Sequence, residues 1–275
     1  MTPSEQDLAV ANAREDKSRR ARLASIFAVA LVFVLVLQAQ PVIAGVPSVL
    51  WSLVILAGAI FVAWRGGLAA RARALLGLAA IRREGLAATE RLNQGDVEGA
   101  QRAYVALLRK AQPLGAFHAV HVLMYGITRF LEGDAKEGLR LTTRVLESGW
   151  LDMRPTREVR HEAETWRVLM LLDQGEVAEA RKRVEASPGA DLVLASIAVC
   201  AYEERWSEEL DQVQKALDNP RFSKASRPMV AVLGIFAARK LGRKDAVAAL
   251  KKVLDAEPLG PVARKNPVLS RFLGS

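Results

Sequence analysis

The hydrophobic pattern begins with a long apolar run near the amino terminus. No residue between Arg22 and Arg65 carries a charge. As one helix, rising about 1.5 Å per residue, this run would be roughly twice as long as the hydrocarbon core of a bilayer is thick. Two prolines, a glycine and two glutamines interrupt it at residues 38–47. The pattern therefore predicts a transmembrane hairpin with helices at about residues 23–43 and 46–64.

The flanks of this hairpin, residues 23–64, indicate its orientation. Trp51 and Trp64 lie near the two ends of the second predicted helix, where indole rings prefer the membrane interface. Basic residues favour the cytoplasmic side, and ten of them flank the hairpin: Arg14, Lys17, Arg19, Arg20, Arg22, Arg65, Arg71, Arg73, Arg82 and Arg83. The prediction is a two-span protein of the bacterial inner membrane, with both termini and the large domain in the cytoplasm. Alternatively, residues 23–37 form a cleaved signal peptide, which leaves the large domain cytoplasmic.

The charge distribution strengthens this interpretation. Residues 1–83 carry ten basic and four acidic side chains, against 29 and 26 in residues 84–275, so six of the nine excess positive charges flank the apolar run. That placement favours anionic lipid over nucleic acid. Residues 1–22 form a basic amino-terminal segment. Residues 65–83 mix arginines with leucines at mostly helical spacing, which predicts an amphipathic connector that either lies on the bilayer or continues the second span.

From residue 84 to residue 258 one unit repeats: an apolar-periodic helix, a tight turn and a second helix. The turns are spaced by 38, 42, 30 and 37 residues and are marked by Gly95, Gly133, Gly175, Arg205 and Gly242. We therefore expect an all-α fold, an α-solenoid of about five helix pairs. Small residues that would let paired helices approach closely are Ala88, Ala100, Gly138, Ala180, Gly234 and Ala246. The proline-rich tail, residues 259–275, should cap the last pair or hang free.

These units resemble tetratricopeptide repeats. The relative spacing of that family is kept in the last unit by Leu233, Gly234, Ala246 and Pro258. The family also has two positions for small residues and one for an aromatic residue, and in the first unit these are Ala88, Ala100 and Tyr104. Arg91 replaces the aromatic residue that the family usually has on the first helix. The three middle units keep the order of helix, turn and helix, but they lack the family's residues at most signature positions. The resemblance, over about residues 84–258, implies a protein-binding architecture.

Candidate chemistry is sparse along the chain. The sequence has no phosphate-binding glycine loop, no dinucleotide fingerprint and no paired-cysteine motif. His118 and His121 share a predicted helical face and His161 is a conceivable third metal ligand, but no clustered cysteine or carboxylate completes the set. The string HEAET at His161 lacks the second histidine of a zinc-protease motif. Cys200 is expected to be a buried apolar residue. We expect no catalytic residue, cofactor or metal.

Repeats without catalytic groups predict a membrane-anchored scaffold or adaptor that binds a protein or peptide partner on its solenoid. Trp166 and Trp206 are candidate anchors for a peptide, although packing between helices is the commoner role of such residues. Basic stretches are short and opposed by acids, so nucleic acid is not an expected partner. Two alternatives remain open: an accessory subunit of a membrane complex for transport, secretion or envelope assembly, and a metal-dependent enzyme using His118, His121 and His161.

Overall fold

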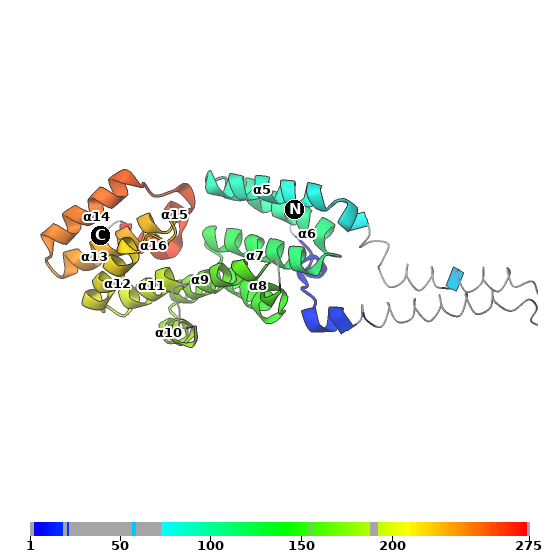
Figure 1. The fold of residues 1–275 in the computed structure, drawn as a ribbon, viewed down its shortest axis with the longest axis horizontal. Helices are drawn as coiled ribbons and strands as arrows, with labels where there is room; N and C mark the ends of the chain where they lie inside the picture. Colours follow the sequence, from blue (N-terminus) through cyan, green and yellow to red (C-terminus); the bar gives the residue numbers. More distant parts are fainter. Residues whose placement is uncertain are drawn as a thin grey trace, which may run out of the picture.

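The computed structural model describes residues 3–18, 21, 57–58, 73–153, 156–187 and 192–273, and every regular element in these residues is a helix. The all-α prediction is therefore confirmed for this part of the chain (Figure 1). The elements are α1 (Glu5–Leu8), α5 (Leu78–Asn93), α6 (Val97–Ala111), α7 (Gly115–Leu131), α8 (Ala135–Glu147), the 3₁₀ helix η1 (Trp150–Asp152), α9 (Arg157–Asp173), α10 (Val177–Ala186), α11 (Val193–Tyr202), α12 (Trp206–Asp218), α13 (Arg227–Lys240), α14 (Lys244–Ala256), α15 (Pro261–Lys265) and α16 (Pro267–Leu273).

Helices α5 to α14 form five consecutive pairs that stack along the molecule (Figure 1). Each helix packs mainly against its neighbours in sequence, and the first helices of successive pairs also contact one another, as α9 does with α7 and α11. The second helices α6, α8 and α12 each have one apolar and one polar face, whereas α11 and α13 are buried over most of their surface. A single pair therefore cannot bury its apolar residues alone. Stacking the pairs creates one continuous core.

The five turns inside the pairs share one backbone conformation. In the second turn, the amide of Gly133 donates to the Phe130 carbonyl (2.9 Å) and the amide of Asp134 donates to the Arg129 carbonyl (2.9 Å). This is the Schellman arrangement, which satisfies the last carbonyls of a helix and requires a left-handed residue after its end. The left-handed residues have φ angles from 58° to 92° and are Gly95, Gly133, Gly175, Glu204 and Gly242. The fourth lies one residue before Arg205, the marker taken from the sequence.

Glu204 predicts a stabilising substitution. Its φ of 58° is sterically unfavourable for a residue with a Cβ atom, whereas glycine adopts this conformation freely. Glu204→Gly should raise the free energy of unfolding by about 1 kcal/mol, measured by urea denaturation. The matched control is Gln94→Gly, at a turn position with φ of −77°, which should not stabilise the chain. Equal effects of the two substitutions would contradict a strained fourth turn.

The small residues expected between helices are mostly buried. Ala88, Ala100 and Ala180 are at most 1% exposed, and Ala246 is half-buried. A Cβ atom on Gly234 would lie 2.7 Å from Val213 Cγ1, so this glycine permits the close approach of α13 to α12. Two further residues of the predicted repeat signature, Leu233 and Tyr104, are buried, and the Tyr104 hydroxyl lies 2.9 Å from Thr89 Oγ1.

The amino-terminal segment packs onto the stack, a contact that the sequence did not indicate. Ser4 and Asp7 form a capping box on α1, and Asp7 forms an ion pair with Arg109 of α6 (3.3 Å). These hydrogen bonds from Ser4, together with the Arg109 guanidinium, lower the pKa of the Asp7 carboxyl. The Asp7 carbonyl lies 2.7 Å from His118 Nε2, and Trp150 Nε1 donates to the Ala11 carbonyl (2.8 Å). The segment is therefore held by polar contacts to three later parts of the chain.

The carboxyl-terminal segment folds back over the stack instead of extending it. Lys265 Nζ donates to the Gly95 carbonyl in the first pair (2.8 Å), and Arg271 pairs with the Asp173 carboxylate in the third (3.7 Å). Phe272 packs edge-on against Tyr202 and Phe236, at centroid distances of 5.9 and 5.0 Å. The segment thus joins the first, third, fourth and fifth pairs.

The localisation predicted from the sequence has to be corrected. Within the described residues, no helix is long and apolar enough to cross a membrane. The longest, α7 and α9, have 17 residues each, whereas a span needs about 20 mostly apolar residues. This finding contradicts the predicted two-span localisation in the bacterial inner membrane. Apart from residues 57–58, the two predicted spans lie outside the described residues. The predicted interface residues also lie outside: Trp51, Trp64, Arg22 and Arg65.

Candidate functional site

A cavity of about 1350 Å³ lies between the first helices of the later pairs and the returning carboxyl-terminal segment. Its walls come from α9, α11, the start of α13, the loop at residues 219–226 and residues 257–266. Asn93, at the end of α5, also lines it. The cavity is therefore a product of the stack and of the segment that folds back over it, since neither encloses the space alone.

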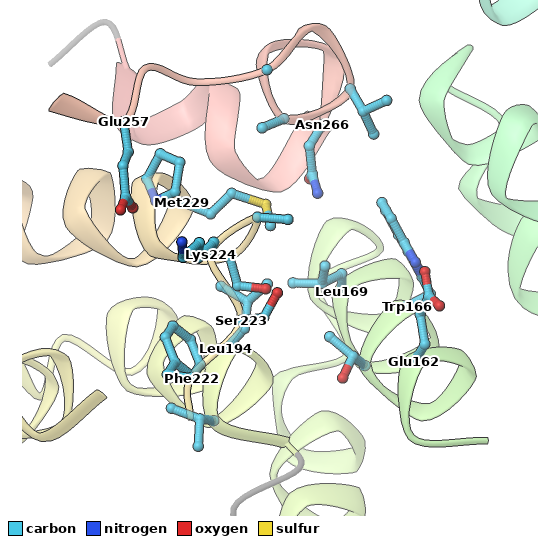
Figure 2. Close-up of a pocket in the computed structure, with 18 of the residues that line it drawn as sticks. Glu162, Trp166, Leu169, Leu194, Phe222, Ser223, Lys224, Met229, Glu257 and Asn266 are labelled. Carbon is cyan, nitrogen blue, oxygen red and sulfur yellow. The ribbon is translucent and has the colours of Figure 1, made fainter. Parts of the chain in front are cut away.

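The apolar part of the wall includes Leu169, Leu194 and Met229, from three different helices (Figure 2). Beside them, the half-buried Trp166 ring packs edge-on against Phe130, with centroids 6.1 Å apart. The contact with Phe130 restrains the indole, and Trp166 presents an aromatic surface to the cavity. An aromatic surface beside aliphatic side chains is typical of a site that binds an apolar group.

Charged side chains lie on two sides of this apolar region. Figure 2 shows Glu162 with Trp166 on one side, and Lys224 beside Met229 on the other, the side on which Glu257 also lies. Glu162, Arg221 and Lys224 are exposed, and no ion pair of theirs occurs within the described residues. Glu257, by contrast, pairs with Arg227 (3.2 Å). The exposed charges without an ion pair are thus negative on one wall and positive on another, while the carboxylate of Glu257 is paired with Arg227.

Asn266 contributes a buried amide to the cavity wall. Its Oδ1 accepts hydrogen bonds from the amides of Val268 (3.0 Å) and Leu269 (3.5 Å), which caps the amino terminus of α16. Those two bonds fix the orientation of the amide group, so Nδ2 is directed away from α16. Nδ2 is buried and has no hydrogen-bond partner in the described part of the chain. In Figure 2 the side chain points into the space between α9 and the loop.

Local sequence explains the loop that forms one wall. Asn219 ends α12 in an extended conformation, and its Oδ1 accepts a hydrogen bond from the Arg221 amide (2.9 Å). Such asparagine side chains stabilise turns. Pro228 lies in the first turn of α13, where a missing amide hydrogen has no cost. The loop is therefore held at both ends, with Phe222, Ser223 and Lys224 between them.

The structure places the two candidate tryptophans differently. Trp166 lines the cavity. Trp206 instead packs edge-on against Phe236, with ring centroids 5.3 Å apart, in the interface of α12 and α13. Pro258, the last residue of the predicted repeat signature, is exposed and also lines the cavity.

The histidines give no metal site in the described residues, where no group of three or more His, Cys, Asp or Glu side chains could hold a metal ion. His118 and His121 are buried in α7, and His161 is exposed on α9. Burial lowers the pKa of His121 to about 4, with His118 adding a smaller effect, so His121 is neutral at pH 7. Cys200 is also buried, and desolvation raises the pKa of its thiol to about 11. A thiol with that pKa is a poor nucleophile.

Sequence reasoning missed Asn266 and the loop at residues 219–226. The sequence carries a local signal for both. Asn219-Pro220 is a pair typical of turns, and Asn266-Pro267 is a pair typical of helix starts. That signal locates a turn or a helix start, but it does not show that both segments border one cavity.

In the part of the chain that the structure describes, these observations define an all-helical protein of stacked helix pairs, with a cavity closed by the carboxyl-terminal segment. Comparison of the chain with protein-family models, with curated proteins and with solved structures gives no match.

Proposed function

We propose that this chain is a tetratricopeptide-like scaffold that binds a segment of another protein in the cavity between α9, α11 and α13. The observation that carries the proposal is the cavity itself, lined by first helices of successive pairs and containing a supported tryptophan. Five pairs with one common turn support the repeat architecture. In such stacks, the surface formed by one helix of each pair is the usual binding surface.

A peptide segment suits this cavity better than a small molecule does. Small-molecule sites typically enclose about 300–1,000 Å³ and contain few charged groups. This cavity is larger, about 1350 Å³, and exposed charges of both signs lie on different walls. A polypeptide can fill the length of such a space and present side chains to each wall, whereas the carboxylate on one wall would repel a nucleic acid backbone.

The test is a co-purification after crosslinking in cells that produce the protein naturally. Thr165→Trp adds an indole to the cavity wall at a half-buried position outside the core, and Lys182→Trp adds the same group to an exposed position on α10. Proteins recovered with the wild-type chain should be lost with Thr165→Trp and kept with Lys182→Trp. Recovery that is unchanged by Thr165→Trp, or recovery of the chain alone, would contradict the proposal.

A further inference from the structure

We infer that the cavity selects a peptide segment in which an apolar side chain stands between a basic residue and an acidic group. This inference rests on the proposed function and names the chemistry of the partner. Its basis is the combination of one anionic wall, one cationic wall and an apolar region between them.

The anionic wall is formed by Glu162 on α9. Its carboxylate is exposed, it borders the cavity, and no ion pair of its own occurs among the described residues. Trp166 follows it by one turn of the helix, and Figure 2 shows the two side chains together. A lysine or arginine can pair with a carboxylate and lie over an indole ring at the same time. This wall therefore favours a basic side chain of the ligand.

The cationic wall is formed by Arg221 and Lys224, on the loop between α12 and α13. Both side chains are exposed, both border the cavity, and neither has an ion pair within the described ranges. Asn219 fixes the backbone of this loop through the Arg221 amide. The wall therefore favours a carboxylate of the ligand, either a side chain or a chain terminus.

The region between the walls is apolar and contains one unused hydrogen-bond donor. Leu169, Leu194 and Met229 provide an aliphatic surface for the central side chain. Asn266 Nδ2 is a buried donor that no described group accepts, and a buried donor left unpaired costs about 1–3 kcal/mol. A backbone carbonyl of an extended peptide is an acceptor of the right kind. The amide is covered by its neighbours, so the ligand must displace them to reach it.

The order of charges distinguishes this ligand from other partners that an apolar cavity accepts. A uniformly acidic segment would be repelled by Glu162, and a uniformly basic segment by Arg221 and Lys224. Like-charge contacts of this kind act against wrong partners and so give selectivity more than affinity.

The inference is tested by selection from a displayed library of random heptapeptides on the purified full-length chain. Enriched peptides should carry an apolar residue between one basic and one acidic residue. Enrichment of peptides without that charge order would overturn the inference and leave the proposed function standing. If no peptide is enriched over selection on the Thr165→Trp variant, the proposed function fails together with the inference.

A charge exchange tests the assignment of Glu162 directly. Binding of an enriched, fluorescein-labelled peptide to Glu162→Lys should weaken about two- to fivefold, a typical effect for an exposed ion pair. The same peptide with its basic residue replaced by glutamate should bind Glu162→Lys better than it binds the wild-type chain. Glu185→Lys, at an exposed position on α10 away from the cavity, is the control and should leave both affinities unchanged. Equal behaviour of the two lysine variants would overturn the inference.

Discussion

Replacing Glu209 by methionine should stabilise the chain strongly at pH 9 and change little at pH 4. Glu209 lies on α12, is 0% exposed, and neither of its carboxylate oxygens has a hydrogen-bond partner within the described residues. Burial raises the pKa of this carboxyl to about 8. In the unfolded chain, a glutamate has a pKa of about 4.3. Above the pKa of the unfolded chain, the carboxyl ionises freely in the unfolded state. In the folded state it must either keep its proton or be buried with its charge, and both lower the free energy of unfolding.

The sign of the pH dependence follows from these two values. Below about pH 4 the carboxyl is protonated in both states and the penalty vanishes. As the pH rises from about 4 to about 8 the penalty grows, and above pH 8 it is constant and on the order of 5 kcal/mol. Methionine has a similar size and no charge, so Glu209→Met should remove this penalty. Urea denaturation of both chains at pH 4 and pH 9 measures the difference.

The matched control is Glu208→Met, one residue earlier on the same helix. Glu208 is about half exposed and pairs with Arg205 (2.9 Å), so its replacement should change stability by less than about 1 kcal/mol at either pH. A stability gain for Glu209→Met that is the same at pH 4 and pH 9 would contradict a charged, unpaired carboxyl at this position.

The second large effect is expected at the contact of α7 and α8. Gly126 and Gly138 face each other: a Cβ atom on Gly138 would lie 2.9 Å from the Gly126 carbonyl oxygen and 3.1 Å from Phe130 Cβ. The first of these neighbours is backbone, so a side-chain rotation cannot relieve the overlap. Gly138→Val should therefore separate the two helices and lower the free energy of unfolding by about 3 kcal/mol. The midpoint of urea denaturation, followed by circular dichroism, measures this loss.

Gly260→Val separates this packing effect from the general consequences of replacing a glycine. Gly260 has a φ of −67°, which valine adopts, and a Cβ atom added to it would have no described atom within 4 Å. Its replacement should leave the midpoint nearly unchanged. Equal losses for the two valine variants would show that close packing of α7 on α8 is not what Gly138 provides.

Much of the fold was predictable because its determinants are local. The 3.6-residue period of apolar side chains identified the helices, and glycine marked four of the five turns, where a left-handed residue is required. The fourth turn was placed one residue late because Glu204 adopts the same conformation without glycine. Nothing in the local sequence distinguishes such a residue from its neighbours.

The contacts between distant parts of the chain were not predictable in the same way. Lys265 bonds to Gly95 across 170 residues, and His118 meets Asp7 across 111. These pairings depend on how the completed stack curves, which no periodic pattern encodes. The sequence singled out Trp166 as a candidate peptide anchor, but its place in a cavity wall depends on Phe130, on Asn266 and on the loop after α12.

The most direct test of the central proposal, that the cavity binds a segment of another protein, is site-specific photo-crosslinking in cells. A photoreactive amino acid at position 165, in the cavity wall, should give a discrete adduct with another protein, and digestion should locate the link in one segment of it. The same group at position 182, exposed on α10, should not give that adduct. Identical adducts from both positions, or none from position 165, would contradict the account.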